Sequence, residues 1–397
     1  MTTKKARKAP ASSGKTSSPA QTTGAVPRIL HLHSSFDAGG KEVRNVRLIE
    51  AFGTQAEHAI VSGDPDRRGA ASLLSGKAKV TWPDFPSLKG KPWPSRLKSL
   101  AQAMQGYDLI CTYNWGAIDA TMAHTLFADP FKLPPLVHHE DGFNEDEANG
   151  LKKRRNLYRQ IALGRSAALV VPSRTLERVA LEVWKQPRPR VQLISNGIDV
   201  QNFLRTPPRD ALPRLIKRKE EYWIGTLAGL RKIKNLPALV RACADLPEAW
   251  QLVIAGEGPE RDAIMEEAER CGIDHRVHLP GFISDPARVV GLFDIFALSS
   301  HSEQFPISLA EAMAAGLPVA APRVGDVGSM VASENGPFLC DAGDEAGLRQ
   351  AIMTLAGDAA LRRRVGNANR DRARQDYDER RMVERYRALY WGLMGRN

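Results

Sequence analysis

Two glutamates flank the start of a predicted helix in the stretch LSSHSEQFPISLAEAMAAGLPV, which spans residues 298–319. Glu303 lies in the polar loop that follows an apolar strand, and Glu311 lies inside a helix that begins near Pro306. The unpaired amides at a helix start favour an anion, because the helix dipole is positive there. A phosphate on those amides, with a carboxylate on each side to accept hydroxyl hydrogen bonds, is the chemistry that a sugar nucleotide requires. An ordinary strand–loop–helix unit, with a solvated Glu303, stays open at this point.

A second predicted anion site lies near the beginning of the chain. Gly39-Gly40 separates a predicted strand at 28–33 from a predicted helix at 41–52. Glycines let the backbone approach a ligand closely, and the helix start that follows them again favours negative charge. A plain turn between strand and helix is the alternative.

The segment from Glu303 to Val319 resembles the signature of retaining glycosyltransferase family 4, the glycosyl transferases group 1. The family pattern, roughly E-G-F-P-x-S-L-x-E-A-M-A-x-G-x-P-V, is matched at nearly every position, and Gln304 replaces the usual glycine. The resemblance implies the GT-B fold, an α/β fold in which two Rossmann-like, doubly wound parallel-sheet domains face a cleft. Predicted strands and helices alternate along the chain, which agrees with such sheets.

The resemblance also implies roles for individual residues. The catalytic positions it implies are His138, Glu303 and Lys234, with Glu303 on the transferred sugar. Glu311 would hold the ribose hydroxyls of the donor. The implied donor-binding residues lie in the glycine turns, a charged loop and the signature helix start: Gly39, Gly40, Arg231, Gly281, Phe305, Pro306, Ile307, Ser308 and Glu311.

The main departure from the family lies after the first predicted strand of the second domain. The family pattern there is roughly G-T-V-x-R-L-x-x-x-K-N, in which Arg and Lys neutralise the donor diphosphate, and this chain reads IGTLAGLRKIKN. Lys234 falls on the family lysine, but Gly229 occupies the arginine position. Arginine offers a bidentate fork that lysine lacks. We therefore expect Arg231 or Lys232 to supply the missing charge, or the site to rest on Lys234 alone.

The sequence VHHEDG at 137–142 ends another predicted strand. Ligands of parallel sheets bind outside the carboxyl ends of the strands, so catalytic groups are expected there. By resemblance, His138 is the family histidine near the transferred sugar. His139 and Asp141 are weaker neighbours that would bind sugar hydroxyls or orient the acceptor. A structural or solvated histidine is the alternative.

The chain of 397 residues is long enough for two domains, each with its own core. Residues 1–26 are rich in Ser, Thr, Ala and Lys and contain no acid, which predicts a disordered basic tail without the apolar segment of a signal peptide. We expect an N-terminal acceptor domain at 27–203, a Pro-rich linker at 204–219 and a nucleotide-sugar domain at 220–375.

The last segment, 376–397, carries an apolar stripe at helical spacing. The resemblance implies that a terminal helix crosses back to the N-terminal domain, and this stripe is a good candidate for the contact. A helix that packs only on its own domain is the alternative. The stripe consists of Met382, Tyr386, Leu389 and Tyr390.

The net charge of +11 favours anionic partners. The four cysteines show no CxxC pair, so neither a disulfide framework nor a zinc site is indicated and a cytoplasmic location is expected. The helix around Lys152–Arg165 is basic and amphipathic, and could lie on an anionic membrane at its inner face; a solvated basic face over a core stripe is the alternative. No segment is apolar enough to span a bilayer.

The sequence therefore predicts a retaining glycosyltransferase of the hexosyltransferase type. It would move a sugar from a UDP- or GDP-linked donor to a glycan or lipid-linked acceptor, in cell-surface polysaccharide or glycolipid synthesis. No metal and no cofactor are expected, because Lys234 and backbone amides can stabilise the diphosphate, and no nucleic-acid partner is expected. Two alternatives stay open: a non-catalytic regulator that binds a nucleotide sugar, and a basic protein that binds membrane or nucleic acid.

Overall fold

The computed structural model describes residues 25–37, 39–143, 151–212 and 214–396. All but residues 25 and 26 of the predicted basic tail lie outside this part of the chain. Within it, seven strands form a first sheet in the order β3-β2-β1-β4-β5-β6-β7, and all of their pairings are parallel. The strands are β1 (Arg28–His33), β2 (Glu57–Ser62), β3 (Lys79–Thr81), β4 (Leu109–Tyr113), β5 (Leu136–His139), β6 (Ala168–Val171) and β7 (Val191–Leu193).

Helices cover both faces of the first sheet. Apolar residues of α2 and α3 pack with Leu30, Leu32 and Ile110 on one face, and α1 packs with Ile29 and Leu109 on the other. Helix α5 covers the β6–β7 end. The helices of this half are α1 (Gly40–Phe52), α2 (Pro94–Ala103), α3 (Ile118–Phe131), α4 (Lys153–Ala162) and α5 (Arg174–Glu182).

A second parallel sheet follows, with six strands among the described residues in the order β10-β9-β8-β11-β12-β13. Two cores sandwich it: one includes residues of α8, α9 and α11, and the other includes residues of α6, α7 and α10. The strands are β8 (Tyr222–Leu227), β9 (Trp250–Ala255), β10 (Val277–Gly281), β11 (Ile295–Ala297), β12 (Val319–Pro322) and β13 (Leu339–Cys340). The helices are α6 (Leu236–Cys243), α7 (Arg261–Arg270), α8 (Ile307–Ala314), α9 (Val327–Met330), α10 (Glu345–Gly357), α11 (Ala359–Asp376) and α12 (Glu379–Leu393).

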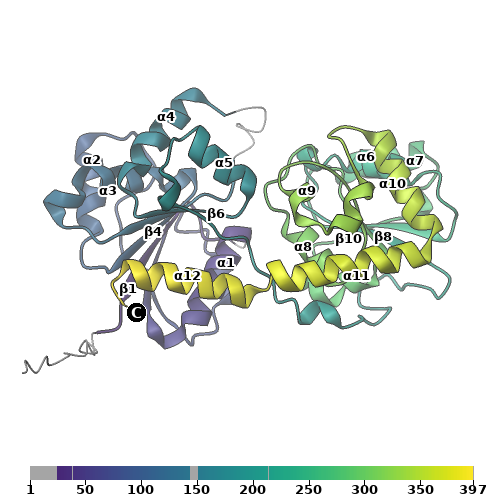
Figure 1. Ribbon diagram of the computed structural model, residues 1–397, viewed down its shortest axis with the longest axis horizontal. Helices are drawn as coiled ribbons and strands as arrows, with labels where there is room; N and C mark the ends of the chain where they lie inside the picture. The colour runs from purple at the N-terminus through teal and green to yellow at the C-terminus, as the bar shows by residue number, and fades with distance from the viewer. Residues whose placement is uncertain (1–24, 38, 144–150, 213, 397) are drawn as a thin grey trace, which may run out of the picture.

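The chain passes between the two sheet domains twice, and the two crossings touch each other. Figure 1 shows α11 running along the second domain and α12 continuing along the first. The amide of Ile198 donates to the carbonyl of Tyr377 over 2.9 Å, and the amide of Glu379 donates back to Ile198 over 2.9 Å. A Cβ on Gly197 would lie 2.5 Å from Cα of Glu379. Glycine at 197 therefore permits the close approach of the two crossing segments.

Helix α12 packs against the first sheet through its apolar stripe. Met382, Tyr386 and Tyr390 are buried in the same core as Ile29 and Leu109. The hydroxyl of Tyr390 lies 2.8 Å from Nε2 of His139. The C-terminal helix is thereby part of the first domain's core.

Two sequence-based expectations need correction. Strand β3 has no counterpart among the predicted strands, because its three residues are largely exposed and carry no apolar run. The second correction concerns the basic helix around Lys152–Arg165, for which an apolar stripe packed on the core was the alternative. That alternative is wrong in part. Leu157 and Ile161 of α4 are 58% and 49% exposed.

Candidate functional site

Lys234 and Glu303 form an ion pair at the carboxyl ends of the second sheet. Nζ of Lys234 donates to Oε1 of Glu303 over 2.6 Å, and both side chains are largely buried. The hydroxyl of Ser300 donates to the same carboxylate oxygen over 2.7 Å. Two donors on one oxygen fix the orientation of the Glu303 carboxylate and leave Oε2 without a hydrogen-bond partner among the described residues. That oxygen is available to accept a ligand hydroxyl.

The loop that carries Glu303 rests directly on a glycine. Gly325 has φ of +55°, and a Cβ there would lie 1.9 Å from the carbonyl oxygen of Glu303. Any other residue at 325 would be strained in this backbone conformation and would displace the Glu303 loop. The glycine-containing loop after β12 therefore contacts the backbone of Glu303 and supports the loop that carries it.

The start of α8 meets the start of α1 at the boundary between the two domains. A Cβ on Gly40 would lie 3.3 Å from Cδ1 of Ile307. The N-cap residues are Gly39 for α1 and Pro306 for α8, and no side chain among the described residues caps either helix. Helix N-termini carry unpaired amides and a positive dipole end. Two helix N-termini therefore lie close together at the domain boundary, and each of them favours an anion.

Glu311 lies on the first turns of α8 and is 9% exposed. Burial raises the pKa of Glu311 to about 7; nearby Asp285 acts in the same direction, and Arg47 of α1 acts against it. Burying the Glu311 carboxylate costs free energy, because it has no hydrogen-bond or ion-pair partner among the described residues. Such a group is more often functional than structural. Hydrogen bonds from ligand hydroxyls would offset that cost.

In the loop after β8, the side chain of Arg231 lies against Gly229, the position at which the family pattern has an arginine. A Cβ on Gly229 would lie 3.5 Å from Nε of Arg231. The Arg231 side chain thus folds back over the position that a side chain at 229 would occupy. The carboxyl end of β10 lies beside this loop, because Glu257 contacts both: its backbone oxygen is 3.9 Å from the same Cβ position on Gly229, and its Oε1 is 3.6 Å from a Cβ position on Gly281.

His138 and Asp141 of the first domain have different surroundings. His138 is fully buried, and its Nδ1 lies 2.8 Å from the hydroxyl of Thr112. Arg44 of α1 instead grips Asp141 with both terminal nitrogens, one of them at 2.9 Å. It also donates to Asn196 over 2.9 Å. His138 is thus enclosed in the first domain, Asp141 is held by Arg44, and the catalytic role of His138 stays a prediction.

Two other signature residues predicted to bind the donor, Phe305 and Ser308, have different surroundings. Phe305 is buried, and its ring lies edge-on to that of Tyr377 at 5.4 Å. Its side chain therefore belongs to the core of the second domain. Ser308 is half-buried in the first turn of α8. The amides of Ile307 and Ser308 are the groups that this segment offers to an anion.

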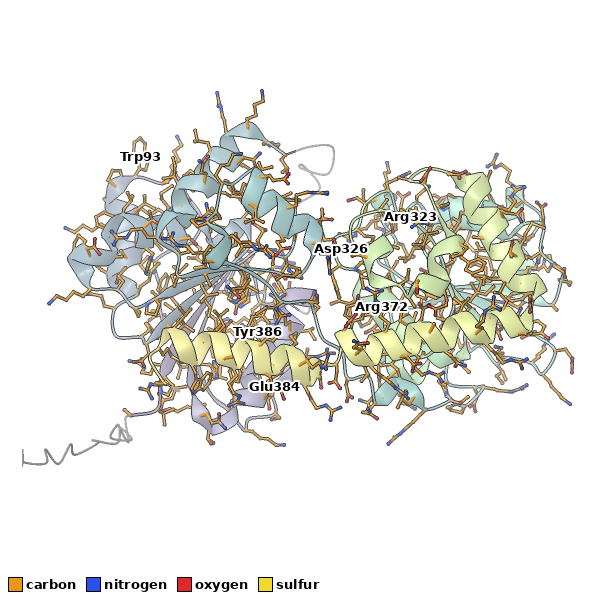
Figure 2. The ribbon with its side chains drawn as sticks, in the orientation of Figure 1. Trp93, Arg323, Asp326, Arg372, Glu384 and Tyr386 are labelled. Carbon is orange, nitrogen blue, oxygen red and sulfur yellow. The ribbon has the colours of Figure 1, made fainter. Side chains whose placement is uncertain are left out.

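Two contacts across the domain boundary were not foreseen from the sequence. Both carboxylate oxygens of Asp326, in the second domain, accept backbone amides at the start of α5: Arg174 at 2.6 Å and Thr175 at 3.0 Å. Figure 2 shows Asp326 at the face of the second domain that is turned toward the first. A Cβ on Gly142 would lie 3.2 Å from Cγ of Gln304. Gln304, which replaces the family glycine, thus contacts the first domain.

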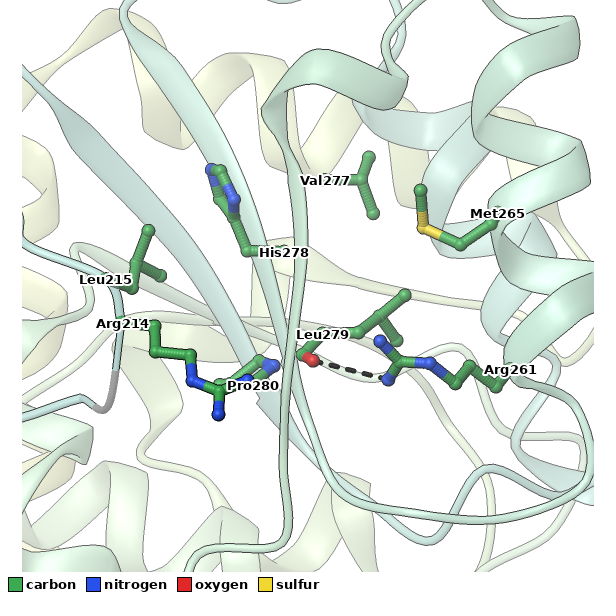
Figure 3. A pocket seen from close by; sticks show the side chains of 8 residues that line it. All are labelled: Arg214, Leu215, Arg261, Met265, Val277, His278, Leu279 and Pro280. Carbon is green, nitrogen blue, oxygen red and sulfur yellow. Dashed lines mark hydrogen bonds between the residues drawn. The ribbon is translucent and has the colours of Figure 1, made fainter.

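A separate hollow of about 600 Å³ lies on the second domain beside the edge strand β10 (Figure 3). Arg214 and Arg261 point into it, and Arg261 donates to the carbonyl of Leu279 over 3.2 Å. Its lining includes none of the residues predicted for the site. Among the described residues, no group of three His, Cys, Asp or Glu side chains could hold a metal ion, and no helix combines the length and apolar character that crossing a membrane needs.

Two family models match the chain, one on each domain. The model described as Glycosyltransferase Family 4 matches residues 38–202, and the model described as Glycosyl transferases group 1 matches residues 210–372.

Three similar proteins are 25% to 28% identical to this chain over 193 to 299 residues. The N-acetyl-alpha-D-glucosaminyl L-malate synthase of Bacillus anthracis is 25% identical over 287 residues, which are 70% of this chain and 72% of that protein. The D-inositol 3-phosphate glycosyltransferase of Xylanimonas cellulosilytica is 28% identical over 299 residues, 70% of this chain and 71% of that protein. The lipopolysaccharide core biosynthesis glycosyltransferase LpsD of Rhizobium meliloti is 25% identical over 193 residues, 48% and 56% of the two chains.

Solved structures share the fold over nearly the whole chain. HepE of Anabaena, in complex with UDP, superimposes with a TM-score of 0.76 at 19% identity and covers 92% of this chain and 100% of its own. The sucrose-phosphate synthase of Thermosynechococcus elongatus superimposes with a TM-score of 0.72 at 21% identity, covering 93% and 99%.

Proposed function

The chain belongs to glycosyltransferase family 4 and has the GT-B fold, and from this premise we propose that it transfers a sugar with retention of anomeric configuration. The donor is a UDP- or GDP-linked sugar, and the acceptor is a glycan or a lipid-linked glycan. The observation that carries the proposal is the meeting of α1 and α8, whose uncapped starts approach each other at Gly40 and Ile307 beside the Lys234–Glu303 pair.

The donor diphosphate binds between these two helix starts. Departure of the nucleotide increases the negative charge on the diphosphate, and preorganised cations and amides stabilise that charge most strongly in the transition state. Lys234 and Arg231 supply the cations. The backbone amides of Ile307 and Ser308 supply hydrogen bonds and the dipole of α8.

The two glutamates hold the two ends of the donor. Glu303, oriented by Lys234 and Ser300, accepts hydrogen bonds from hydroxyls of the transferred sugar through its unpaired oxygen. Glu311 accepts hydrogen bonds from the ribose hydroxyls. We assign no covalent nucleophile: the acceptor hydroxyl attacks from the side on which the nucleotide leaves.

We assign no metal ion and no cofactor to the reaction. The charge on the leaving group is met by Lys234, Arg231 and the two helix starts. This part of the proposal makes a direct prediction: transfer should persist when divalent ions are chelated.

The relatives support a role in building glycans. LpsD belongs to lipopolysaccharide core biosynthesis by its name, and HepE was solved with UDP and with UDP-glucose. Two other relatives have names that mention an anionic molecule, L-malate in one and D-inositol 3-phosphate in the other.

We propose that the first domain also meets an anionic membrane surface. Three exposed apolar side chains support this: Trp93 is 64% exposed, Leu157 58% and Ile161 49%. Figure 2 shows Trp93 projecting outward from the first domain. Leu157 and Ile161 lie on α4, and the sequence of this helix, KRRNLYRQIA, is strongly basic. Flotation with vesicles containing anionic lipid, compared with neutral vesicles, tests this part.

The experiment that tests the function begins with a panel of nucleotide sugars in thermal unfolding. A donor that binds only the folded state raises the melting temperature. The stabilising donor is then incubated with glycan and glycolipid acceptors, and the anomeric configuration of the product is read by NMR. Donor binding without transfer or hydrolysis would favour a non-catalytic regulator. Binding to membrane or nucleic acid that falls steeply with salt and ignores changes at Glu303 and Glu311 would favour the basic binding protein.

A further inference from the structure

The cavity of about 600 Å³ beside β10 lies at the edge of the second sheet (Figure 3). Strand β10 is the last strand of that sheet among the described residues, and its register against β9 shifts between His278 and Gly281. Such an irregularity bends a strand and leaves part of its backbone unpaired. Pro280 lies within it and has no amide hydrogen to donate to a further strand. The sheet therefore ends in a hollow whose volume is usual for a small-molecule site.

Among the described residues, two arginines and no acid line the cavity. Arg214 belongs to the segment that precedes β8, and Arg261 is the first residue of α7. Arg214 has neither a hydrogen bond nor an ion pair within the part of the chain that the structure describes. Arg261 donates to the carbonyl of Leu279 over 3.2 Å, and its other donors have no partner among the described residues. The lining thus carries two positive charges that no lining acid offsets.

Acids close to the cavity do not neutralise these arginines. Glu260 and Asp262 stand on either side of the α7 arginine in the sequence, but neither lines the cavity nor forms an ion pair with it. Burial lowers the pKa of His278, and the nearby charge of Glu221 acts against that effect. Glu221 is itself engaged by Arg218, whose amide donates to it over 2.9 Å and whose Nε lies 3.6 Å from its carboxylate.

The backbone holds both arginines in place. Leu212 and Leu215 form an antiparallel bridge around Arg214. Leu212 is buried in a core of the second domain, and Leu215 packs against the same core. Figure 3 shows the side chains of Arg214 and Arg261 reaching toward each other from opposite sides of the Leu279–Pro280 segment. Guanidinium groups presented from fixed segments lose less freedom when they bind an anion.

The rest of the lining is apolar apart from His278. Nε2 of His278 lies 3.0 Å from Oε1 of Gln251, so this ring has a partner within the protein. The cavity therefore places an apolar surface next to a double positive charge. A molecule with one doubly charged anionic group and an apolar body would match both features. The apolar lining consists of Leu215, Met265, Val277, Leu279 and Pro280.

We propose that this cavity binds a phosphomonoester, a small molecule that joins a phosphate to an apolar body, at a site separate from that of the donor. A phosphomonoester carries two negative charges above its second pKa of about 6, so it balances both arginines, whereas a carboxylate balances only one. Each of Arg214 and Arg261 can donate two parallel hydrogen bonds to phosphate oxygens. The apolar body packs against Leu215 and Met265. The inference goes beyond the proposed function, because the lining includes no residue assigned to the sugar donor.

Calorimetric titration of the full chain at pH 8 with 1-naphthyl phosphate, 1-naphthoate and 1-naphthol tests the proposal. We expect 1-naphthyl phosphate to bind about tenfold more tightly than either of the other probes, because it alone can occupy both arginine forks. The double variant R214Q/R261Q should bind it about tenfold more weakly than wild type. Each single variant should bind it about threefold more weakly, which keeps the test decisive if the double variant does not fold.

The matched control is R209Q/R270Q. It removes one arginine from the segment before β8 and one from α7, and neither residue lines the cavity. Because both double variants lose the same net charge, a general electrostatic attraction would weaken equally in the two proteins. We expect R209Q/R270Q to bind 1-naphthyl phosphate as wild type does. K234A, which changes the proposed donor site, should also bind it normally.

Three results would overturn the inference. The first is an affinity for 1-naphthoate or 1-naphthol that equals or exceeds the affinity for 1-naphthyl phosphate. The second is binding of 1-naphthyl phosphate that is absent in wild type, survives in R214Q/R261Q, or weakens equally in R209Q/R270Q. The third is a loss of binding in K234A, which would locate the probe at the donor site. None of these measurements uses sugar transfer, so their outcome is independent of the proposed function.

Discussion

Gly40 and Ile307 lie against each other across the domain boundary, with only 3.3 Å between Cδ1 of Ile307 and the place of a Cβ on Gly40. The first residue begins α1 in the N-terminal domain, and the second begins α8 in the C-terminal domain. Because both helix starts lack a side-chain cap among the described residues, we expect their amides to be available to a ligand.

Glu311 should lower the free energy of unfolding at neutral pH, and it should strengthen binding of the donor. The folded state holds the proton of Glu311 more tightly than the unfolded chain, because burial raises its pKa from 4.5 to about 7. The cost of ionising it therefore grows as pH rises through this window and amounts to about 3 kcal/mol at most. We expect E311Q to melt higher than wild type at pH 8, to match it near pH 5, and to bind the donor at least tenfold more weakly.

The control for Glu311 is E266Q, at an exposed position of α7. It should change neither the melting temperature nor donor affinity. An E311Q protein that melts like wild type at pH 8 would refute the costly buried carboxylate. An E311Q protein that binds the donor as tightly as wild type would refute the role of Glu311 in donor binding.

Arg231 should be replaceable by an arginine at the family position. We expect R231A to weaken binding of the nucleotide diphosphate about tenfold, a loss of about 1.4 kcal/mol, because it removes a bidentate cation from the site. In the double variant G229R/R231A the new side chain starts where Arg231 now folds back, and affinity should recover. K232A is the matched control and should have a smaller effect. Calorimetric titration with UDP and GDP measures the affinity of wild type and of the three variants. If affinity does not recover in the double variant, an arginine at 229 cannot replace Arg231.

Asp326 should hold the two domains together. The D326A variant leaves the amides of Arg174 and Thr175 without their acceptor, which costs about 1 kcal/mol, as for other helix caps. Because this cap comes from the other domain, we also expect a larger radius of gyration in small-angle X-ray scattering.

The matched control for Asp326 is D344A. Asp344 accepts the amide of Gly347 over 2.9 Å and so caps α10 within its own domain. It should lower stability by a similar amount without expanding the molecule. If D326A is as compact as D344A, the contact does not restrain the domains.

The first domain should lose stability in acid through its buried histidines. Burial lowers the pKa of His31, His33 and His139 well below 6.5, and that of His58 to about 4. The unfolded chain binds protons at these sites below pH 6.5 and the folded chain does not, so stability falls as pH falls. Unfolding in urea between pH 7.5 and 4.5 should show this slope.

H58Q should make the slope shallower by about 1.4 kcal/mol per pH unit between pH 6 and 4.5, because one proton fewer is taken up on unfolding. The matched loss of an imidazole is H275Q, at an exposed position of the second domain. A slope in H58Q equal to that of wild type would show that His58 is not held neutral.

Much of the fold could be predicted because buried parallel strands are continuous apolar runs. β1, β4 and β5 are buried almost throughout, and their sequences show it. β3 and β13 could not be found in the same way. β3 has three largely exposed residues and β13 has only two, so neither leaves an apolar run long enough to recognise.

The site was predictable where one local segment builds it. Glu303, Pro306 and Glu311 share one loop and helix, so their spacing alone places them together. The prediction for His138 rests on the family resemblance alone, because all four residues of β5 are buried and alternation along the strand does not tell which side chain lies nearest a ligand. Its catalytic role stays a prediction. The role of Asp326 depends on how the two domains sit against each other. No local pattern encodes that.

The most direct test of the central claim is calorimetric titration of UDP and GDP into wild type and K234A at one fixed ionic strength. The account predicts that one of the two nucleotides binds wild type and that K234A binds it at least tenfold more weakly, while K79A, which removes an exposed lysine beside Glu57, binds it normally. Affinity that is unchanged in K234A, or the absence of binding by either nucleotide, would contradict the claim that the donor diphosphate binds beside Lys234.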